Sequence, residues 1–280
     1  MSKDFTLIIF VVLATLSSGL LGSAALAAVR GSARIPLKAI VSSGAVSLAV
    51  GAGLSLATLG HPELFLGALS HVGTGIFWQL FGSIVCFTGA VVFLVLSFRD
   101  DEGPALKVFA VLAAAGALIA VVGVGRSFVM PWRLAWASWS IVGVFLGFAL
   151  SSVACFSLFL NQYFEEHQSI PAWLRGVAVL LCPLSLVWYL TSIGLSSEPE
   201  AGEILSRALI GGAAPIFWAM ALGGVLAPVL CLSVRSKGRF VGLAGSLVSA
   251  VGAGAFQYLL LLLDTCLLYT SPSPRDRTRS

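Results

Sequence analysis

The side chains that could hold a metal or a haem are few in this chain and lie far apart. All three histidines, His61, His71 and His167, fall in segments that join apolar runs. A haem b between membrane helices takes axial ligands that project into the bundle, so this placement disfavours a cytochrome b. The cysteines before residue 266 lie singly in different runs, whereas iron–sulfur and zinc sites need clustered thiolates. The sequence contains no phosphate-binding loop with its lysine either. We therefore expect that the chain itself binds no redox cofactor and no metal.

Two polar stretches are the most informative parts of the sequence. The first runs from Ser55 to Gln79 and includes two of the histidines and Glu63. The second runs from Arg126 to Trp139 and includes Trp132. Both stretches lie at the ends of long apolar runs, so their placement depends on what those runs form.

The composition is that of a protein that spans a membrane several times. Apolar residues make up 58% of the 280 residues and charged residues only 10%, against roughly 25% charged in a soluble domain. Runs of about 20 apolar residues are long enough to cross the hydrocarbon core as helices. We predict an all-α membrane protein with about eight transmembrane helices. The expected helices are Phe5–Val29, Ala39–Leu59, Ile76–Phe98, Ala105–Gly125, Trp136–Leu160, Leu174–Gly194, Ala213–Val234 and Val241–Leu263.

Short sequence echoes suggest that the eight helices form two parallel four-helix bundles. Gly75-Ile-Phe-Trp78 is echoed by Pro215-Ile-Phe-Trp218, and Leu16-Ser-Ser18 by Leu150-Ser-Ser152, each four helices further on. Parallel repeats of this kind occur in membrane proteins. Chance matches in an apolar sequence of low diversity are the alternative. Glycines in the second and last expected helices, at Gly51, Gly53, Gly252 and Gly254, predict close helix packing.

The lysines and arginines predict the orientation of the bundle. With the N-terminus outside, nine of the basic residues before residue 266 fall on the inner side and four on the outer side. The positive-inside rule therefore favours an outside N-terminus. Trp132, Trp136 and Trp139 are then expected near the outer lipid interface. The net charge of +4 arises from such loops and the tail, and does not indicate a nucleic-acid partner.

The last fifteen residues differ in character from the rest. Residues 266–276, Cys-Leu-Leu-Tyr-Thr-Ser-Pro-Ser-Pro-Arg-Asp, resemble the translation of a transposase sequencing adapter. We therefore expect residues 1–265 to form the membrane domain and residues 266–280 to be non-native.

The two polar stretches resemble the membrane-anchor subunit of the dimethyl sulfoxide (DMSO) reductase family (DmsC-like). Leu59-Gly-His-Pro62 matches a Leu-Gly-x-Pro turn after the second helix of that family, and Gln79 is a polar residue early in the third. Arg126 near the end of the fourth helix, followed by Pro131-Trp132, matches a second patch. The chain departs from the family in having Thr58 where a histidine is common, and Gln79 in place of an acidic residue.

This resemblance implies a subunit that oxidises menaquinol in a bacterial cytoplasmic membrane. Electrons would pass to a docked iron–sulfur subunit, and a molybdopterin subunit would reduce the terminal acceptor. The implied quinol-binding residues are His61, Glu63, His71, Gln79, Arg126 and Trp132. His61 would accept a proton and Glu63 would relay it to the outer solvent.

Simpler roles stay open for several of these residues. A loop histidine is often only solvated, and Gln79 is equally suited to a hydrogen bond between helices. Arg126 is suited to snorkelling toward the interface, and Trp132 to an interfacial belt. Two other functions are consistent with the sequence. One is a polysulfide-reductase-type (NrfD-like) anchor, and the other is a small-solute transporter, although the polar groups gather near the outer face rather than at mid-membrane.

Overall fold

The computed structural model describes residues 3–31, 35–57, 67, 70–99, 103–131, 133–165, 170–198, 200–233, 238 and 240–270, with the backbone alone at residues 3, 4, 57 and 264–270. Over these residues it is a helical bundle with eight helices long and apolar enough to cross a membrane, which confirms the predicted fold class. The unbroken spans are α1 (Lys3–Arg30), α2 (Leu37–Ala57), α3 (Gly75–Phe98), α4 (Pro104–Ser127), α5 (Ser140–Tyr163), α6 (Ala172–Gly194) and α10 (Val241–Thr270).

The seventh span consists of three consecutive pieces. It runs through α8 (Ala214–Ala219), the π-helical segment η3 (Met220–Leu226) and α9 (Ala227–Ser233). Pro215 lies in the first turn of α8, where its missing N–H costs no helical hydrogen bond. Pro228 follows the π-helical segment, in which the Ala227 N–H donates to the carbonyl of Leu222, five residues back. The span as a whole was predicted, but its widened turn was not.

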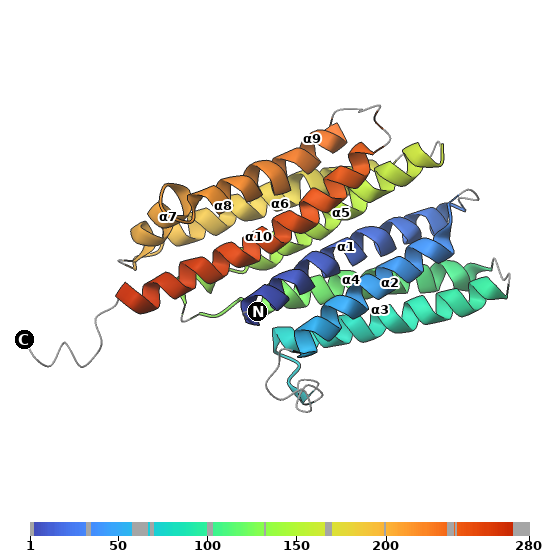
Figure 1. Ribbon diagram of the computed structural model, residues 1–280, viewed down its shortest axis with the longest axis horizontal. Coiled ribbons are helices and arrows are strands. Elements are labelled where there is room, and N and C mark those ends of the chain that lie inside the picture. The colour runs from blue at the N-terminus through green and yellow to red at the C-terminus, as the bar shows by residue number, and fades with distance from the viewer. Residues whose placement is uncertain are drawn as a thin grey trace, which may run out of the picture.

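The eight spans pack as two groups of four, as the sequence echoes predicted (Figure 1). In the first group, α1 packs along α2 and α4, and α3 packs along α4. In the second, α5 packs along α6 and α10, and the seventh span packs against α10. The groups meet where α1 contacts α5 and α10 and where α4 contacts α5. Each helix of the first group makes the same contacts as the helix four places later in the second group. For example, α1 packs along α2 as α5 packs along α6. This is the arrangement of a parallel repeat.

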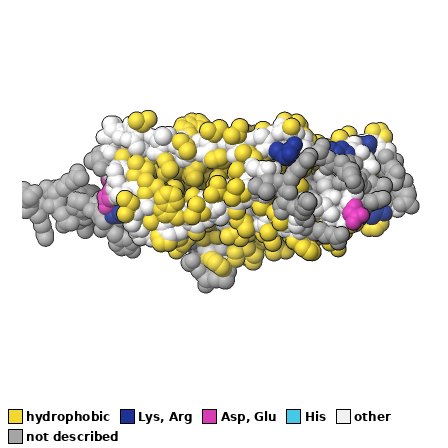
Figure 2. Space-filling model, turned by 90° about the horizontal axis from the view of Figure 1, so that it is seen from above, with side chains coloured by type: hydrophobic (Ala, Val, Ile, Leu, Met, Phe, Trp, Pro, Cys, Tyr) yellow, Lys and Arg dark blue, Asp and Glu magenta, His cyan; other side chains and the backbone are white. Residues whose placement is uncertain are grey.

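The outside of the bundle is apolar along its length. Val91, Leu184 and Val251 are examples of exposed aliphatic side chains in the middle of spans. Figure 2 shows hydrophobic side chains over the middle of the visible face, with charged ones gathered toward its two ends. Such a surface suits contact with lipid chains rather than water.

Glycines bring several helix backbones into contact. A Cβ atom at Gly82 would lie 2.4 Å from the backbone nitrogen of Ala120, and one at Gly116 would lie 2.3 Å from that of Cys86. These contacts join α3 tightly to α4. The predicted close packing is also found at Gly51, Gly252 and Gly254, whereas Gly53 has nothing within 4 Å and the prediction was wrong there.

The segment between α4 and α5 corrects one predicted boundary. Helix α5 begins at Ser140 rather than at Trp136, which lies in the short 3₁₀-helix η2 (Leu134–Trp136). Trp136 is only 7% exposed, and its Nε1 donates a hydrogen bond of 3.1 Å to the Leu260 carbonyl. It is therefore not an interfacial residue as predicted, because its indole N–H is satisfied inside the bundle. Trp139 is exposed, as expected.

Candidate functional site

A narrow cavity, here called the slot, lies between α1, α2 and α3 in the half of the bundle where α1 begins. That end of the bundle is called the N-terminal end below. The slot has a volume of about 170 Å³. Its lining residues are Phe10, Ala52, Ser55, Leu56, Gln79, Leu80, Ser83, Ile84 and Phe87. Ile84 is exposed on the outer surface of α3, so the slot borders the region where lipid would lie. Its walls are mostly apolar and aromatic, with three polar residues among them.

Gln79 is the largest polar side chain in the slot, and its hydrogen bonds fix the orientation of its amide. Its Nε2 donates a bond of 2.9 Å to the Oγ of Ser127 on α4. The Ser127 hydroxyl in turn donates to the carbonyl of Gly123 at 3.0 Å, so it must act as the acceptor toward Gln79. This assigns the other amide atom, Oε1, as the acceptor available to a ligand. The alternative role of Gln79, a hydrogen bond between helices, is therefore confirmed, and its role in binding quinol stays a prediction.

Ser83 supplies a second polar group one turn further along α3. Its Oγ donates to the backbone carbonyl of Gln79 at 2.8 Å. The lone pairs of the Ser83 hydroxyl are therefore free to accept a hydrogen bond. Gln79 and Ser83 thus offer two acceptors in a slot whose walls include Phe10 and Phe87. Such an arrangement can bind a planar ring that carries hydroxyl groups.

Arg126 lies at the N-terminal end of the bundle, in the last turn of α4. Its Nη2 donates to the Gly73 carbonyl at 3.4 Å, and its guanidinium carbon lies 4.3 Å from the centre of the Trp139 ring. Arg126 therefore bridges the segment before α3 and the segment before α5.

His71 is exposed, and it lies in the turn before α3. Its Nδ1 lies 2.9 Å from the Oγ of Ser70 and 3.4 Å from the Gly67 carbonyl. The same turn is tied to α3 by Thr74, whose Oγ1 accepts a bond of 3.2 Å from the Phe77 N–H. His71 is near the start of α3 but does not line the slot.

The structure thus brings together only part of the predicted site. Gln79 lines the slot, while His71 and Arg126 lie at the same end of the bundle. His61, Glu63 and Trp132 lie outside the described residues. The sequence reasoning missed Ser83 and Ser127. The spacing of Ser83, four residues after Gln79 on one helix face, was a signal that could have identified it.

Two cysteines that are far apart in the sequence approach the same glycine. A Cβ atom at Gly245 would lie 2.9 Å from the Sγ of Cys155 and 3.5 Å from that of Cys231. The sequence reasoning treated these cysteines as separate. Among the described residues, no group of three potential metal ligands comes together.

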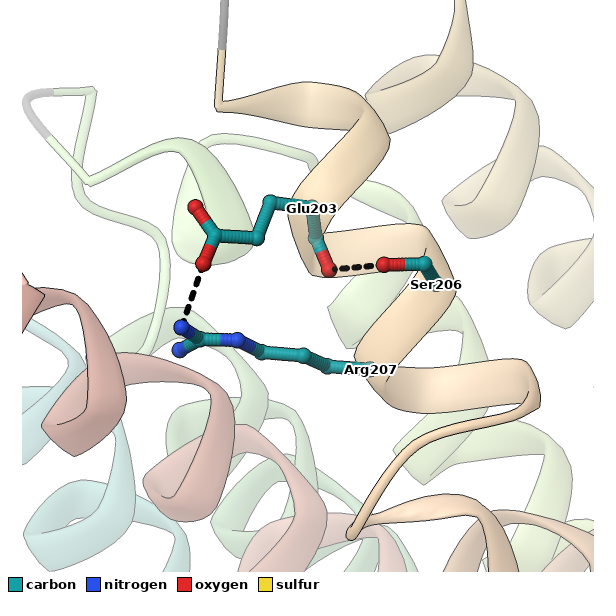
Figure 3. A network of polar contacts seen from close by, with 3 residues as sticks. All are labelled: Glu203, Ser206 and Arg207. Atoms are coloured by element: carbon teal, nitrogen blue, oxygen red, sulfur yellow. Dashed lines mark hydrogen bonds and ion pairs between the residues drawn. The ribbon is translucent and has the colours of Figure 1, made fainter.

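The short helix α7 (Ala201–Leu209) lies at the N-terminal end of the second group and was not predicted. Its Ala201, Ile204 and Ala208 are buried. On its outer side the Glu203 carboxylate pairs with Arg207 one turn later, and the Ser206 Oγ donates to the Glu203 carbonyl at 2.9 Å (Figure 3). The pair is partly exposed, with Arg207 at 25% and Glu203 at 47%, and such a pair within one helix contributes little stability. The helix therefore covers this end of the bundle.

Comparisons with known proteins do not assign the chain to a family, since no family model and no curated protein matches it.

Proposed function

We propose that this chain is the membrane-anchor subunit of an anaerobic molybdopterin oxidoreductase of the DMSO reductase type. It binds and oxidises menaquinol in the slot and passes the electrons to a docked iron–sulfur subunit. The observation that supports this most is the slot itself, because it is apolar, borders the lipid and contains the oriented amide of Gln79. A lipid-soluble substrate reaches such a slot from the membrane.

The slot suits the chemistry of quinol oxidation at the level of hydrogen bonding. Oxidising a quinol to a quinone releases two protons and two electrons. The Gln79 Oε1 accepts a hydrogen bond from one quinol hydroxyl and holds the ring between apolar walls. An amide is not a base at neutral pH, so the protons leave toward the N-terminal end. There, an imidazole is a suitable proton acceptor. The chain has His71 in that region, and His61 lies ten residues earlier in the sequence.

The proposed complex has a defined orientation. The chain lies in a bacterial cytoplasmic membrane with its N-terminal end outside, so the slot is in the outer half of the membrane. The basic side chains Lys38, Arg99 and Lys107 lie at the opposite end, as the positive-inside rule requires. The electrons then go to the iron–sulfur subunit, and a molybdopterin subunit uses them to reduce the terminal acceptor.

The second candidate is a small-solute transporter, which the parallel arrangement of the two groups favours. Transporters commonly place ionisable side chains near the middle of the membrane. Among the described residues no acidic or basic side chain is buried, and the buried polar side chains are serines, threonines, Gln257 and Tyr189. This composition supports the anchor over the transporter. A polysulfide-reductase-type anchor would use the same kind of slot.

The test is to titrate a fluorescent hydroxyquinoline N-oxide, which mimics a quinol, with the purified chain in lipid nanodiscs. We expect stoichiometric quenching of its fluorescence. Gln79→Leu should weaken binding about two- to tenfold, because it removes one hydrogen bond worth about 0.5–1.5 kcal/mol. Gln257→Leu is the matched control, since it removes the same group from a helix that does not line the slot.

The outcomes separate the function from the position of the site. No quenching by a folded chain would exclude a quinol anchor. Quenching that is unaffected by Gln79→Leu but lost in His61→Ala would preserve the function and place the site in the segment between α2 and α3.

A further inference from the structure

A second hollow, here called the groove, lies between α1 and α10. It has a volume of about 710 Å³. Its lining residues are Phe5, Ile8, Val12, Val251, Gly254, Ala255 and Tyr258. None of them lines the slot. Ile8 and Val12 lie one turn apart on α1, and Phe10 between them is roughly 200° around the helix from each. The groove and the slot are therefore on opposite sides of α1.

The groove is open to the surroundings of the bundle. Phe5 is 49% exposed, Val251 is 62% exposed and Tyr258 is 42% exposed. Because the spans place this surface in the membrane, the medium that fills the groove is lipid rather than water. Tyr258 is the one lining residue with a polar side chain.

The shape of the groove favours a hydrocarbon chain over a helix of another protein. Phe5 and Val12 are seven positions apart, as are Val251 and Tyr258, which gives the groove a length of about 10 Å at ~1.5 Å per residue. A helix that crosses the ~30 Å hydrocarbon core is about three times as long as the groove, whereas an acyl chain occupies only one leaflet, about 15 Å of that thickness. The groove also follows the helix axes, which is the direction of an acyl chain in a bilayer.

Gly254 and Tyr258 give the groove a floor and a polar end. A Cβ atom at Gly254 would lie 2.6 Å from the Cγ2 of Val12. Helix α10 therefore contacts α1 at this point, and the contact forms the floor of the groove. Tyr258 and Phe5 lie toward the N-terminal end of the bundle. A tyrosine near the membrane interface commonly directs its hydroxyl toward the polar layer.

We propose that the groove binds an acyl chain of one phospholipid from the leaflet at the N-terminal end. The hydroxyl of Tyr258 donates a hydrogen bond to the ester carbonyl of this lipid. The binding energy comes from packing contacts and this hydrogen bond, not from removing apolar surface from water. The bound lipid covers the seam between the two groups of helices. This site is independent of the quinol-binding function.

Native mass spectrometry of the purified chain, released from detergent micelles after extraction, tests the proposal. We expect the wild-type chain to retain one phospholipid. Val251→Trp fills the groove from its rim and should abolish retention. Val46→Trp is the matched control, because Val46 is 60% exposed on α2 and lines neither hollow. Tyr258→Phe should lower the retained fraction.

Either of two results would overturn the proposal. One is retention by Val251→Trp equal to that by Val46→Trp. The other is a retained mass that matches an isoprenoid quinone instead of a phospholipid. If Val251→Trp does not fold, Tyr258→Phe decides, and unchanged retention in that variant contradicts the proposed site. Quinol-analogue quenching is measured separately, so a failure of one proposal leaves the other standing.

Discussion

Gln79 and Gln257 are two amides inside the membrane part of the bundle, and they differ in their hydrogen bonds. The Nε2 of Gln79 donates to Ser127. Gln257 is only 2% exposed, and its Oε1 has no hydrogen-bond partner. A buried polar atom without a partner costs about 1–3 kcal/mol. Gln257 therefore lowers the stability of the fold, whereas Gln79 is held in place by its bond.

This difference predicts opposite effects of the same substitution. Gln257→Leu should raise the thermal midpoint of the purified chain in detergent, by an amount equivalent to about 1 kcal/mol, because it removes the unpartnered oxygen at similar volume. Gln79→Leu should lower the midpoint, because Ser127 loses its donor. Thermal unfolding followed by tryptophan fluorescence measures both. If Gln257→Leu lowered the midpoint, the side-chain oxygen of Gln257 would have a stabilising partner, contrary to this interpretation.

The sequence predicted Gln79 as a site residue because it is a large polar side chain in an otherwise apolar run. It did not predict Ser127, which lies 48 residues away, because no pattern along one helix identifies a partner on another. His61 and Glu63 were proposed from loop positions alone, and their roles stay predictions.

At the scale of the elements, the tight contact between α3 and α4 positions the slot. A Cβ atom at Gly123 would lie 2.3 Å from the backbone nitrogen of Gln79. Only a glycine lets the two helices come this close, and the closeness allows Gln79 to reach Ser127. Helix α2 has a smaller contact with α3, and the slot lies along that seam.

Packing between α3 and α4 predicts a strong effect of enlarging a glycine. Gly116→Leu should destabilise the chain by about 1–3 kcal/mol or more, because its Cβ would meet the backbone of Cys86, which cannot move aside. Gly53→Leu is the control, since Gly53 has nothing within 4 Å. Thermal midpoints and the yield of monodisperse protein measure the difference. Equal losses in both variants would be inconsistent with this packing.

Hydropathy predicted all eight spans because each span must satisfy its own backbone hydrogen bonds in lipid. The elements that the sequence missed depend instead on contacts between distant segments. Trp136 is held by the Leu260 carbonyl, and Trp218 donates to the Leu209 carbonyl at the end of α7 at 3.0 Å. The π-helical segment η3 lies where Gly224 packs against Gly252. The hydrophobic periodicity of a single segment does not predict such contacts.

At the scale of the whole molecule, the two groups of helices are similar in packing but not in chemistry. The shared Ile-Phe-Trp sequence aligns Gln79, which follows Trp78, with Ala219, which follows Trp218. The second group therefore has no amide at the matching position. The π-helical segment begins one residue later, at Met220, where α3 continues as an α-helix. The slot lies in the first group only, and the second group packs against the first through α5 and α10.

The two ends of the molecule differ in charge, which predicts how it sits in the membrane. Of the described basic residues, five lie at the end opposite the N-terminus, namely Arg30, Lys38, Arg99, Lys107 and Arg175, and four lie at the N-terminal end, namely Lys3, Arg126, Arg133 and Arg207.

The positive-inside rule predicts that the more basic end faces the cytoplasm. Ser197→Cys, in the exposed segment between α6 and α7, should then react with a membrane-impermeant maleimide in intact spheroplasts. Arg99→Cys, exposed at the end of α3, should react only after the membrane is opened. The wild-type chain gives the background, since its described cysteines are buried or half-buried. The reverse pattern of labelling would place the N-terminal end in the cytoplasm. The slot would then face inward, and the proposed quinol oxidation would release its protons into the cell.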